Sequence, residues 1–494
     1  MINIVTLKNK ILELALCGKL TKQLESDGTS EELYNEIQAE KARMIKEGRI
    51  KKKKPLQKIE DDEIPFIIPD NWKWIKFAEL CEIINGDRGK NYPAKSTLKK
   101  VGIPFISALN LDGKSVIDDE NLFCMDDEQY ENIGSGKLQR GDIIICIRGS
   151  LGKHGKYPFD KGAIASSLVI SRVYFAADFI GDYEMLWLDS LMFQRQIRKY
   201  DGGTAQPNLA ANNLEKFLFP LPPLAEQKRI CKIVKEAYRL IDAIDKLQLR
   251  YSIDVDILRG KLIDAGIQGK LTTQLPEDGT AEDLYSEIQA DKARILKKRK
   301  GREDKKIKTV EKDVPFEIPG YWKWVRLGDI GLFKKGPFGS ALTKSMFVKK
   351  GADTVKVYEQ QHAIKRDNEL GTYYITREYF DEKMSGFEVM PGDIIVSCAG
   401  TIGETYIMPD GIEHGIINQA LMRITLAEGI DKKFFQYYFE AQLKKSAQEE
   451  SNGSAIKNIP PFDVLKNWYF PLTSIEEQRR IVSKIDELLI AMHT

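Results

Sequence analysis

Apolar residues in the middle of the chain recur at heptad spacing from Leu224 to about Gly269. One apolar column consists of Ile230, Ala237, Ile244, Tyr251 and Leu258, and the other of Val234, Ile241, Val255 and Leu262. Within each column the residues are seven positions apart, and the two columns together give an apolar residue every 3.5 positions on average. This spacing predicts a long helix that packs against a similar helix. At 1.5 Å per residue this helix would be on the order of 60 Å long.

The same apolar phase returns at both ends of the chain. Ile481, Ile485, Leu488 and Met492 continue it near the C-terminus, and Leu7, Ile11 and Leu14 restart it near the N-terminus. We therefore predict a long antiparallel coiled coil, in which one continuous helix packs against a helix that is split between the two ends of the chain.

Between these helical segments lie two stretches with a different pattern. Short apolar runs such as Asp142–Ile147 and Asp393–Ser397 are separated by Gly and Asn turns and predict strands. Tyr183–Tyr200 and Lys432–Ala447 are predicted helices. The fold class is therefore α+β, with two mixed α/β domains joined by helices. We divide the chain into helical segments at 1–65, 221–315 and 472–494 and globular domains at 66–220 and 316–471.

The two halves of the chain repeat each other with an offset of 251 residues. DGTSEELYNEIQAEKAR at 27–43 returns as DGTAEDLYSEIQADKAR at 278–294, with 13 of 17 positions identical. A repeat of this length is a duplicated module, because the units of solenoids span only about 20–50 residues. Since symmetric assemblies usually relate their copies by an axis, we expect a pseudo-twofold circular arrangement of the two modules.

Composition narrows the class of protein. The net charge is +2, hydrophobic residues make up 42%, and no apolar run reaches the roughly 18 residues that a membrane span needs. The six cysteines show no CxxC spacing and the four histidines show no metal-ligand spacing, so we expect reduced cysteines, no metal site and a cytoplasmic protein. Basic runs at 49–58 and 297–308 suit either phosphate contacts or solvated linkers.

The sequence contains no catalytic constellation. The phosphate-binding GxxxxGK[ST] motif and the glycine-rich dinucleotide motif are absent. The segment that comes nearest to a nuclease motif, Glu226-Gln227-Lys228, lies at the start of the predicted coiled-coil helix and returns only as Glu477-Gln478-Arg479. We interpret it as structural, and we predict no catalytic residue.

Four motifs occur in the same order in both halves. They are Gly-Lys-Leu-Thr at 18–21 and 269–272, Ile-Pro-x-x-Trp-x-Trp at 68–74 and 318–324, Gly-Asp-Ile-Ile at 141–144 and 392–395, and Phe-Pro-Leu followed by Glu-Gln-x-x-Ile at 219–230 and 470–481. Two variable domains that alternate with two repeated helical segments in this permuted order resemble the specificity subunit of a type I restriction-modification system. The resemblance covers essentially the whole chain.

This resemblance implies that each globular domain is a target recognition domain that reads one half of a split double-stranded DNA site. The helical segments would fix the spacing of the two halves and bind two copies of a methyltransferase subunit. Partner subunits would supply the chemistry, the methyltransferase with S-adenosylmethionine and a motor-nuclease restriction subunit with ATP and Mg²⁺. The chain itself would be non-catalytic and would hold no cofactor.

Candidate DNA-binding residues lie in loops that differ between the two copies. Direct readout favours Arg or Lys on guanine and Asn or Gln on adenine. In the first domain we select Arg88, Lys90, Asn91, Tyr92, Arg148 and Lys153. In the second domain we select Lys334, Lys335, Ser340, Lys344, Gln360, Gln361 and Asn418. The helical segments of the two copies, which we call the arms, repeat closely, whereas the loops of the two globular domains differ. This contrast predicts an asymmetric DNA target, in which the spacing of the half-sites follows the protein geometry.

Three other hypotheses stay open at this stage. A fused restriction and methylation enzyme would need the cofactor and nuclease motifs that the sequence lacks. A protein-binding scaffold without DNA specificity would bind its partners regardless of DNA. A specificity subunit that serves methylation alone would have the same biochemistry as one that serves restriction.

Overall fold

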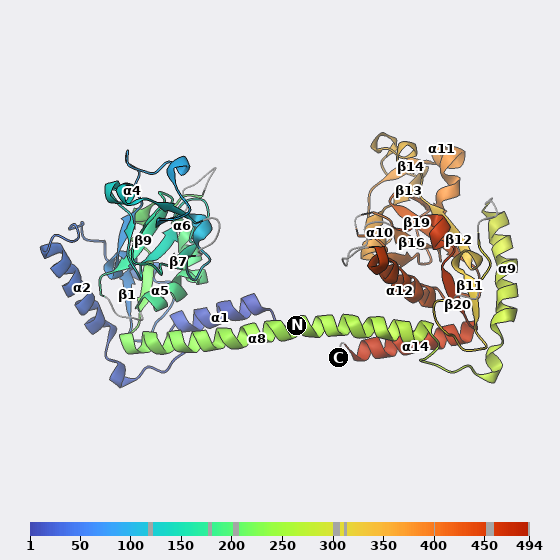
Figure 1. Ribbon diagram of the computed structural model, residues 1–494, viewed down its shortest axis with the longest axis horizontal. Coiled ribbons are helices and arrows are strands. Elements are labelled where there is room, and N and C mark those ends of the chain that lie inside the picture. Colours follow the sequence, from blue (N-terminus) through green and yellow to red (C-terminus); the bar gives the residue numbers. More distant parts are fainter. Residues whose placement is uncertain are drawn as a thin grey trace. The chain divides into compact units, whose positions relative to one another are not determined.

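The computed structural model describes residues 1–116, 122–175, 180–200, 207–299, 307–310, 314–399, 401–450 and 459–492. The chain divides into two compact units, unit 1 comprising Met1–Arg250 and unit 2 comprising Tyr251–Thr494 (Figure 1). The boundary between them falls within the long helix α8 (Leu224–Ile267), which contributes residues to both units.

The described strands of unit 1 form three sheets. The first is the antiparallel pair β1-β10, which joins the two ends of the globular domain. The second is the antiparallel sheet β2-β9-β6-β7. The third is β4-β3-β8-β5, in which β3 and β8 are parallel. The strands are β1 (Lys73–Lys76), β2 (Cys81–Asn85), β3 (Ile103–Ile106), β4 (Phe123–Met125), β5 (Lys137–Leu138), β6 (Ile143–Cys146), β7 (His154–Lys156), β8 (Gly162–Ile164), β9 (Leu168–Val173) and β10 (Leu218–Leu221). The helices before α8 are α1 (Ile4–Leu16), α2 (Ser30–Lys46), α3 (Phe77–Leu80), α4 (Asp127–Asn132), α5 (Ile180–Leu188), α6 (Leu191–Tyr200) and α7 (Ala211–Leu214).

Unit 2 repeats this topology strand for strand. Its sheets have the orders β11-β20, β12-β19-β16-β17 and β14-β13-β18-β15, with β13 and β18 parallel. The strands are β11 (Lys323–Arg326), β12 (Gly331–Lys335), β13 (Thr354–Tyr358), β14 (Tyr374–Thr376), β15 (Glu388–Val389), β16 (Ile394–Ser397), β17 (Thr405–Ile407), β18 (Gly415–Ile417), β19 (Leu421–Leu426) and β20 (Tyr469–Leu472). The helices after α8 are α9 (Ala281–Lys298), α10 (Gln360–Lys365), α11 (Arg377–Tyr379), α12 (Lys432–Glu450), α13 (Phe462–Leu465) and α14 (Ile475–Ala491). The predicted duplication of a mixed α/β domain is confirmed, and the pseudo-twofold placement of the two units stays a prediction.

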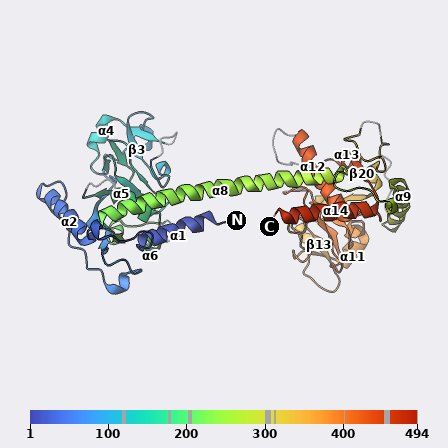
Figure 2. The same cartoon turned by 90° about the horizontal axis from the view of Figure 1, so that it is seen from below.

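In unit 1 the first part of α8 packs antiparallel against α1 (Figure 2). Leu12 and Leu16 of α1 share a buried core with Ile230 and Val234 of α8. Further along the pair, Gln248 accepts a hydrogen bond from the backbone N–H of Ile2 and donates one to its carbonyl oxygen. The single polar residue of the apolar column therefore binds the free backbone groups at the start of the partner helix.

In unit 2 the second part of α8 packs antiparallel against α14, and here one detail of the predicted seam is wrong. Ile263 and Ile267 share a buried core with Ile481 and Ile485 of α14. By contrast, Tyr251 is 54% exposed and Leu258 is 46% exposed, although both belong to a predicted apolar column. An α-helix has 3.6 residues per turn, whereas the heptad pattern assumes 3.5, so heptad positions drift slowly around a straight helix. Near the C-terminus of α8 the buried residues therefore lie about one position away from those that the heptad predicts.

A buried carboxylate joins α8 to the repeated motifs of unit 1. Glu226 at the start of α8 is fully buried and accepts hydrogen bonds from Trp72 Nε1 at 2.8 Å, Thr21 Oγ1 at 2.6 Å and Gln23 Nε2 at 2.9 Å. Three donors on one carboxylate satisfy a charge that would otherwise be costly to bury. Glu226 is therefore structural, as predicted, and Trp72 is a core residue.

The same joint occurs in unit 2. Glu477 is fully buried and accepts hydrogen bonds from Trp322 Nε1 at 3.0 Å, Thr272 Oγ1 at 3.1 Å and Thr473 Oγ1 at 2.6 Å. The repeated Gly-Lys-Leu-Thr, Trp-x-Trp and Glu-Gln motifs are thus three parts of one contact. We name this contact the Trp–Glu joint: Trp72 with Glu226 in unit 1 and Trp322 with Glu477 in unit 2.

Gly18 explains why the first of these motifs begins with glycine. Its φ of +66° lies in the left-handed region, and a Cβ atom there would come within 2.4 Å of Pro69 Cγ. Only glycine combines this backbone conformation with so close a contact. Gly269 repeats the arrangement, with a φ of +69°, and a Cβ atom there would come within 2.7 Å of Pro319 Cγ.

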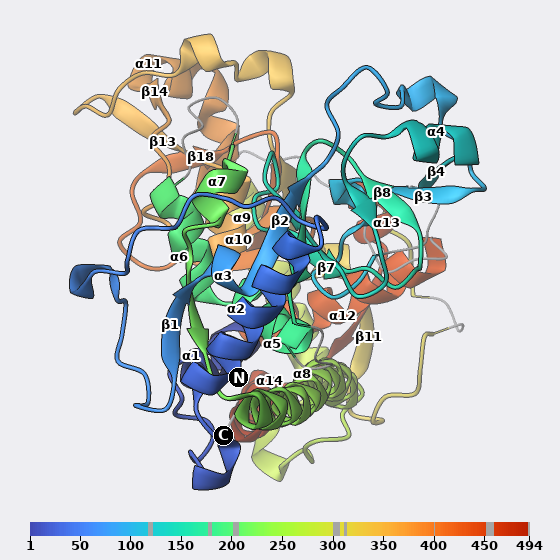
Figure 3. The ribbon, with the colours of Figure 1, turned by 90° about the vertical axis from the view of Figure 1, so that its left-hand side faces the viewer.

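The helix α2 links the arm of unit 1 to its globular domain. Thr29 caps its N-terminus by accepting the backbone N–H of Glu32 at 3.3 Å. Figure 3, in which unit 1 faces the viewer, shows α2 beside α3. Gln38 and Lys41 donate hydrogen bonds to the carbonyl oxygens of Glu79 and Ala78 at the two ends of that contact, both at 2.9 Å. These bonds fix the globular domain on its arm.

Candidate DNA-recognition loops

The loop after β2 carries four candidate residues on a rigid frame. The carboxylate of Asp87 accepts the backbone N–H groups of Gly89 at 2.6 Å and Gly134 at 2.7 Å. These hydrogen bonds hold the pKa of Asp87 below its usual value. The side chains that this frame presents to solvent are those of Arg88, Lys90, Asn91 and Tyr92.

Three of these side chains also contact the protein. Asn91 Nδ2 donates to the carbonyl oxygen of Asn132 at 2.7 Å, and the ring of Tyr92 packs edge-on against Phe105. Arg88 Nη2 donates to the carbonyl oxygen of Ser166 at 3.3 Å. The loop is therefore preorganised, and its exposed cations are held beside the turn that precedes β9.

The same turn brings Arg148 to this edge of the first domain. The backbone N–H of Ile147 donates to the carbonyl oxygen of Ser167 at 2.9 Å, so the chain after β6 runs next to the chain before β9. Arg148 itself is exposed. The structure thus places Arg88 and Arg148 on the two sides of the turn at Ser166 and Ser167, although the sequence separates them by 60 positions.

Lys153 has a different environment from the other candidates. It is half-buried, and its Nζ donates to the carbonyl oxygen of Ala108 at 2.8 Å. The ammonium group therefore already holds the turn after β3. Its hydrogen bond is shorter than that of Arg88, the other candidate in the first domain whose charged group donates to a protein carbonyl oxygen.

The second domain arranges its loops in the same way. The backbone N–H of Gly336 donates to the carbonyl oxygen of Leu421 at 2.9 Å, and a Cβ on Gly336 would come within 1.8 Å of the carbonyl oxygen of Asn418. The backbone N–H of Cys398 donates to the carbonyl oxygen of Ala420 at 2.8 Å, as Ile147 does to Ser167 in the first domain. Gly336, which follows Lys335, therefore lies against Asn418, at the edge that corresponds to the Arg88 edge.

Lys334 and Lys335 point to opposite faces of β12, because side chains alternate along a strand. Lys334 stands opposite Arg423 of β19 and lies 4.8 Å from the ring centre of Phe387. Lys335 stands opposite Met422. The structure thus places two candidates that are adjacent in the sequence on opposite faces of the sheet.

The α10 helix brings two amide side chains to the same region. The backbone N–H of Asn418 donates to the carbonyl oxygen of Tyr358, two residues before Gln360, at 2.9 Å. Gln360 Oε1 is buried without a hydrogen-bond partner among the described residues, and Gln361 Nε2 donates to Glu359 at 2.9 Å. An unsatisfied buried amide oxygen is costly, and Gln360 therefore retains an unused acceptor.

The loop after β12 holds the remaining candidates, Ser340 and Lys344, both exposed. The same loop presents Phe338, whose side chain is 87% exposed. Sequence reasoning passed over Phe338, because base readout was sought among polar side chains. Its position between Gly336 and Gly339 is the sequence signal that could have identified it, since short glycine-flanked loops present their side chains to solvent.

The described residues give no indication of a metal site or membrane span. They contain no group of three or more His, Cys, Asp and Glu side chains that could hold a metal ion, and none of their helices has the length and apolar character required to cross a membrane. All six cysteines are free thiols. Of the second basic run, residues 300–306 lie outside the described residues.

Comparison with known proteins agrees with this architecture. The EcoAI type I restriction enzyme specificity subunit of Escherichia coli is 25% identical, over 98% of this chain and 88% of its own. The putative MjaX type I restriction enzyme specificity subunit of Methanocaldococcus jannaschii is also 25% identical, over 85% of this chain and 88% of its own. The crystal structure of the HsdS subunit from Thermoanaerobacter tengcongensis has the same fold, with a TM-score of 0.51, 18% identity, and coverage of 87% of this chain and 92% of that one.

The family match covers both halves of the chain. Residues 69–253 and 319–493 each match the family described as "Type I restriction modification DNA specificity domain". The two matched segments begin within the Ile-Pro-x-x-Trp-x-Trp motifs; the first extends into α8 and the second includes α14. Taken together they make up more than half of the sequence, so this chain belongs to the type I restriction-modification DNA specificity family and is a specificity subunit, the non-catalytic member of its complex.

Proposed function

We propose that this specificity subunit reads an asymmetric, bipartite double-stranded DNA sequence, one half with each mixed α/β domain. The observation that supports this most directly is the contrast between frame and loops. Both domains have the same strand orders, yet the loop after β2 carries Arg88 and Lys90, whereas the corresponding loop after β12 carries Phe338 and Ser340. Equal frames with unequal side chains suit two different half-sites.

Within each domain, we assign DNA contacts to one edge. In the first domain this edge holds Arg88, Lys90 and Arg148, and in the second it holds Lys335, Gln360 and Asn418. Exposed cations suit phosphate or guanine contacts, and amide groups suit adenine. Lys153 and Lys334 are weaker candidates, because Lys153 already holds a protein carbonyl group and Lys334 lies on the opposite face of the strand from Lys335.

The arms are proposed to bind two copies of a methyltransferase subunit. The helical segments of the two units repeat each other in sequence at 27–43 and 278–294, and both contain the Trp–Glu joint, so we expect them to present two like surfaces. Along α8, exposed apolar side chains provide a surface for helices of a partner, and three of them follow one another at heptad spacing. These residues are Ile233, Leu240 and Leu247, followed by Ile253 and Ile257.

The chemistry is proposed to reside in partner subunits. S-adenosylmethionine would be bound by the methyltransferase subunit, and ATP with Mg²⁺ by a motor-nuclease restriction subunit. This chain would hold no cofactor and would contribute only target choice and spacing. A protein scaffold without DNA specificity is not favoured, because the family match extends over both globular domains.

The test is to express the chain together with the methyltransferase subunit encoded beside it and to map methylated adenines in the host genome by single-molecule sequencing. The proposal predicts one interrupted, asymmetric motif that is methylated in the presence of this chain and not in its absence. A soluble complex that binds no DNA at low salt, or a palindromic motif, would contradict it.

A further inference from the structure

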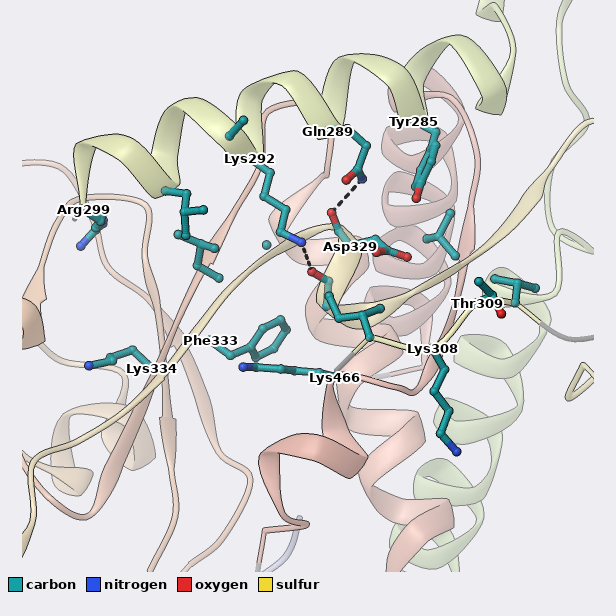
Figure 4. Close-up of a pocket in the computed structure, with 18 of the residues that line it drawn as sticks. Tyr285, Gln289, Lys292, Arg299, Lys308, Thr309, Asp329, Phe333, Lys334 and Lys466 are labelled. Atoms are coloured by element: carbon teal, nitrogen blue, oxygen red, sulfur yellow. Dashed lines mark hydrogen bonds between the residues drawn. The ribbon is translucent and has the colours of Figure 1, made fainter. Parts of the chain in front are cut away.

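A cavity of about 990 Å³ lies between α9 and the edge strand β12 in unit 2 (Figure 4). Hydrogen bonds tie α9 to the chain that leads into β12: Lys292 Nζ donates to the carbonyl oxygen of Gly328 at 2.5 Å, and Gln289 Nε2 donates to that of Asp329 at 3.1 Å. Lysine and arginine side chains along the cavity wall outnumber acidic ones by seven to one. Its electrostatic character is therefore cationic.

Two of these cations face each other across a pair of strands. The register of β12 and β19 places Lys334 directly opposite Arg423. In unit 1 the corresponding register of β2 and β9 places Ile84 opposite Ile170, and each of these residues holds the same position in its strand as its counterpart. An apolar cross-strand pair in one domain is thus a pair of like charges in the other. Like charges in this arrangement destabilise a sheet.

The carboxylate of the repeated Gly-Asp-Ile-Ile motif is bound to an arginine in both units. In unit 1, Asp142 accepts hydrogen bonds from Arg172 Nε at 2.8 Å and Nη2 at 2.6 Å. In unit 2 the equivalent residue of the Gly-Asp-Ile-Ile motif, Asp393, is bound instead by Arg299 Nη2 from the end of α9, at 2.9 Å to each carboxylate oxygen. Arg299 therefore forms an ion pair with the carboxylate of Asp393, and its guanidinium group is a third cation on this side of the cavity.

Arg423 is left only partly satisfied. It is 4% exposed, and its Nη1 donates to the backbone carbonyl oxygen of Glu388, while the carboxylate of Glu388 lies 2.8 Å from His414 Nε2. Arg423 Nε has no hydrogen-bond partner among the described residues. Burial, with Arg299 nearby, lowers the pKa of Arg423 to about 10, although the carboxylates of Asp393 and Glu388 oppose this shift. Burial together with Arg423 lowers the pKa of Lys334. A buried guanidinium with a free donor needs a negative partner.

We propose that this cavity is an anion site that binds a phosphate group, with Arg423 at its floor and Lys334 at its mouth. Arginine at the floor offers the planar donors that suit a tetrahedral oxyanion, and Lys334 is exposed enough to close on it from solvent. The phosphate belongs either to the DNA backbone or to a small free ligand, and the two sources share this chemistry. Unit 1 has isoleucines at the two positions, so the site is specific to unit 2.

The test uses the full chain in complex with its methyltransferase subunit, titrated calorimetrically with inorganic pyrophosphate. Lys334→Ile introduces the residue found in unit 1, and Lys335→Asn does the same at the next position, which faces the other side of the strand. We expect saturable binding that Lys334→Ile weakens roughly 10- to 100-fold, the contribution of one or two charge-assisted hydrogen bonds. Lys335→Asn should bind as the wild type does. Absence of saturable binding, or equal binding by Lys334→Ile, overturns the proposal.

A second readout is the unfolding temperature, measured first without pyrophosphate and then with it. The double variant Lys334→Ile/Arg423→Ile reproduces the cross-strand pair of unit 1. If the two cations repel each other in the empty site, this variant unfolds at a temperature equal to or above that of the wild type, and pyrophosphate raises the unfolding temperature of the wild type only. A double variant that unfolds well below the wild type would show that the cations are stabilising without an anion, which contradicts the proposal.

Competition with DNA distinguishes the two sources of phosphate, and this arm alone rests on the proposed DNA-reading function. If the site holds a backbone phosphate, target duplex displaces pyrophosphate, and Lys334→Ile lowers the slope of log K against log salt by about one. If it holds a free ligand, pyrophosphate and duplex bind together and the slope stays the same. Failure of the DNA-reading function itself would appear as loss of the methylation motif while pyrophosphate binding persists.

Discussion

Glu184 is a carboxyl group whose removal should change the pH dependence of folding in the first domain. It lies on α5, is fully buried, and has no hydrogen-bond partner for either carboxylate oxygen among the described residues. Burial raises its pKa from 4.5 to about 8, and this exceeds the opposing effects of the Ser171 hydroxyl and the Lys156 ammonium group. Asp142 adds to the rise. Glu184 is therefore neutral in the folded domain at pH 7 and charged in the unfolded chain.

The sign follows from proton binding. Between the unfolded pKa of 4.5 and the folded pKa of about 8, the folded state holds a proton that the unfolded state has lost, so stability falls as pH rises through this window. At 1.36 kcal/mol per pKa unit, the loss amounts to about 5 kcal/mol. Glu184→Gln keeps the shape of the side chain and removes the titration, so its stability should be nearly independent of pH in the same window.

Hydrogen exchange of peptides that span α5 measures this opening free energy locally. After correction for intrinsic exchange, the wild type should lose several kcal/mol of protection between pH 5 and pH 8.5, and Glu184→Gln should not. Asp182→Asn is the matched control, because Asp182 lies on the same helix but is half-exposed and paired with Lys156 at 2.8 Å. A Glu184→Gln variant with the wild-type slope would refute the assignment of this pH dependence to Glu184.

Three further predictions concern the joints and the DNA edge. Trp72→Phe should cost about 1–3 kcal/mol in unfolding free energy, measured by chemical denaturation, because Glu226 loses one of its three donors; wild-type stability would show that the bond is dispensable. Gly18→Ala should cost about 3 kcal/mol, since it adds a steric clash to an unfavourable φ. Gly48→Ala, with a φ of +71° but open space around it, should cost only about 1 kcal/mol, and equal costs would exclude the clash. Arg148→Ala should weaken duplex binding in a titration and either lower the salt slope by about one or relax a single position of the motif; unchanged binding would remove it from the site.

The coiled coil shows how far periodicity carries a prediction. The heptad columns predicted α8 and its buried residues Ile230, Val234 and Ile241 correctly. Towards the C-terminus of α8 the prediction placed Leu258 in the seam, whereas Ile263 is buried there. The apolar pattern contains candidates at neighbouring positions, and only the contact with α14 decides between them.

The Trp–Glu joint shows a second limit of sequence reasoning. The motifs that contain Trp72 and Glu226 are visible as repeats, and a structural role for Glu226 was predicted correctly. Their hydrogen bond was not predicted, because the two residues lie 154 positions apart and no local rule links an indole to a carboxylate at such a separation. Long-range partners of this kind follow from the packing of the whole domain.

The candidate DNA edge was predicted only in part. Loop residues such as Arg88 and Lys90 were found because they differ between the copies and are polar. Lys334 was selected together with Lys335, since the strand β12 was not predicted to include both; within a strand, alternation alone would have placed them on opposite faces. The apolar Phe338 has no polar signal, and only the flanking Gly336 and Gly339 point to its exposure, which is 87% in the structure.

The most direct test of the account exchanges each globular domain with that of another specificity subunit and maps the methylated motif for each chimera. Replacement of residues 66–220 should change one half of the interrupted motif and leave the other half and the spacer as they were, and replacement of residues 316–471 should do the converse. A chimera in which one replacement alters both halves, or in which neither changes the motif, would contradict the assignment of one half-site to each domain.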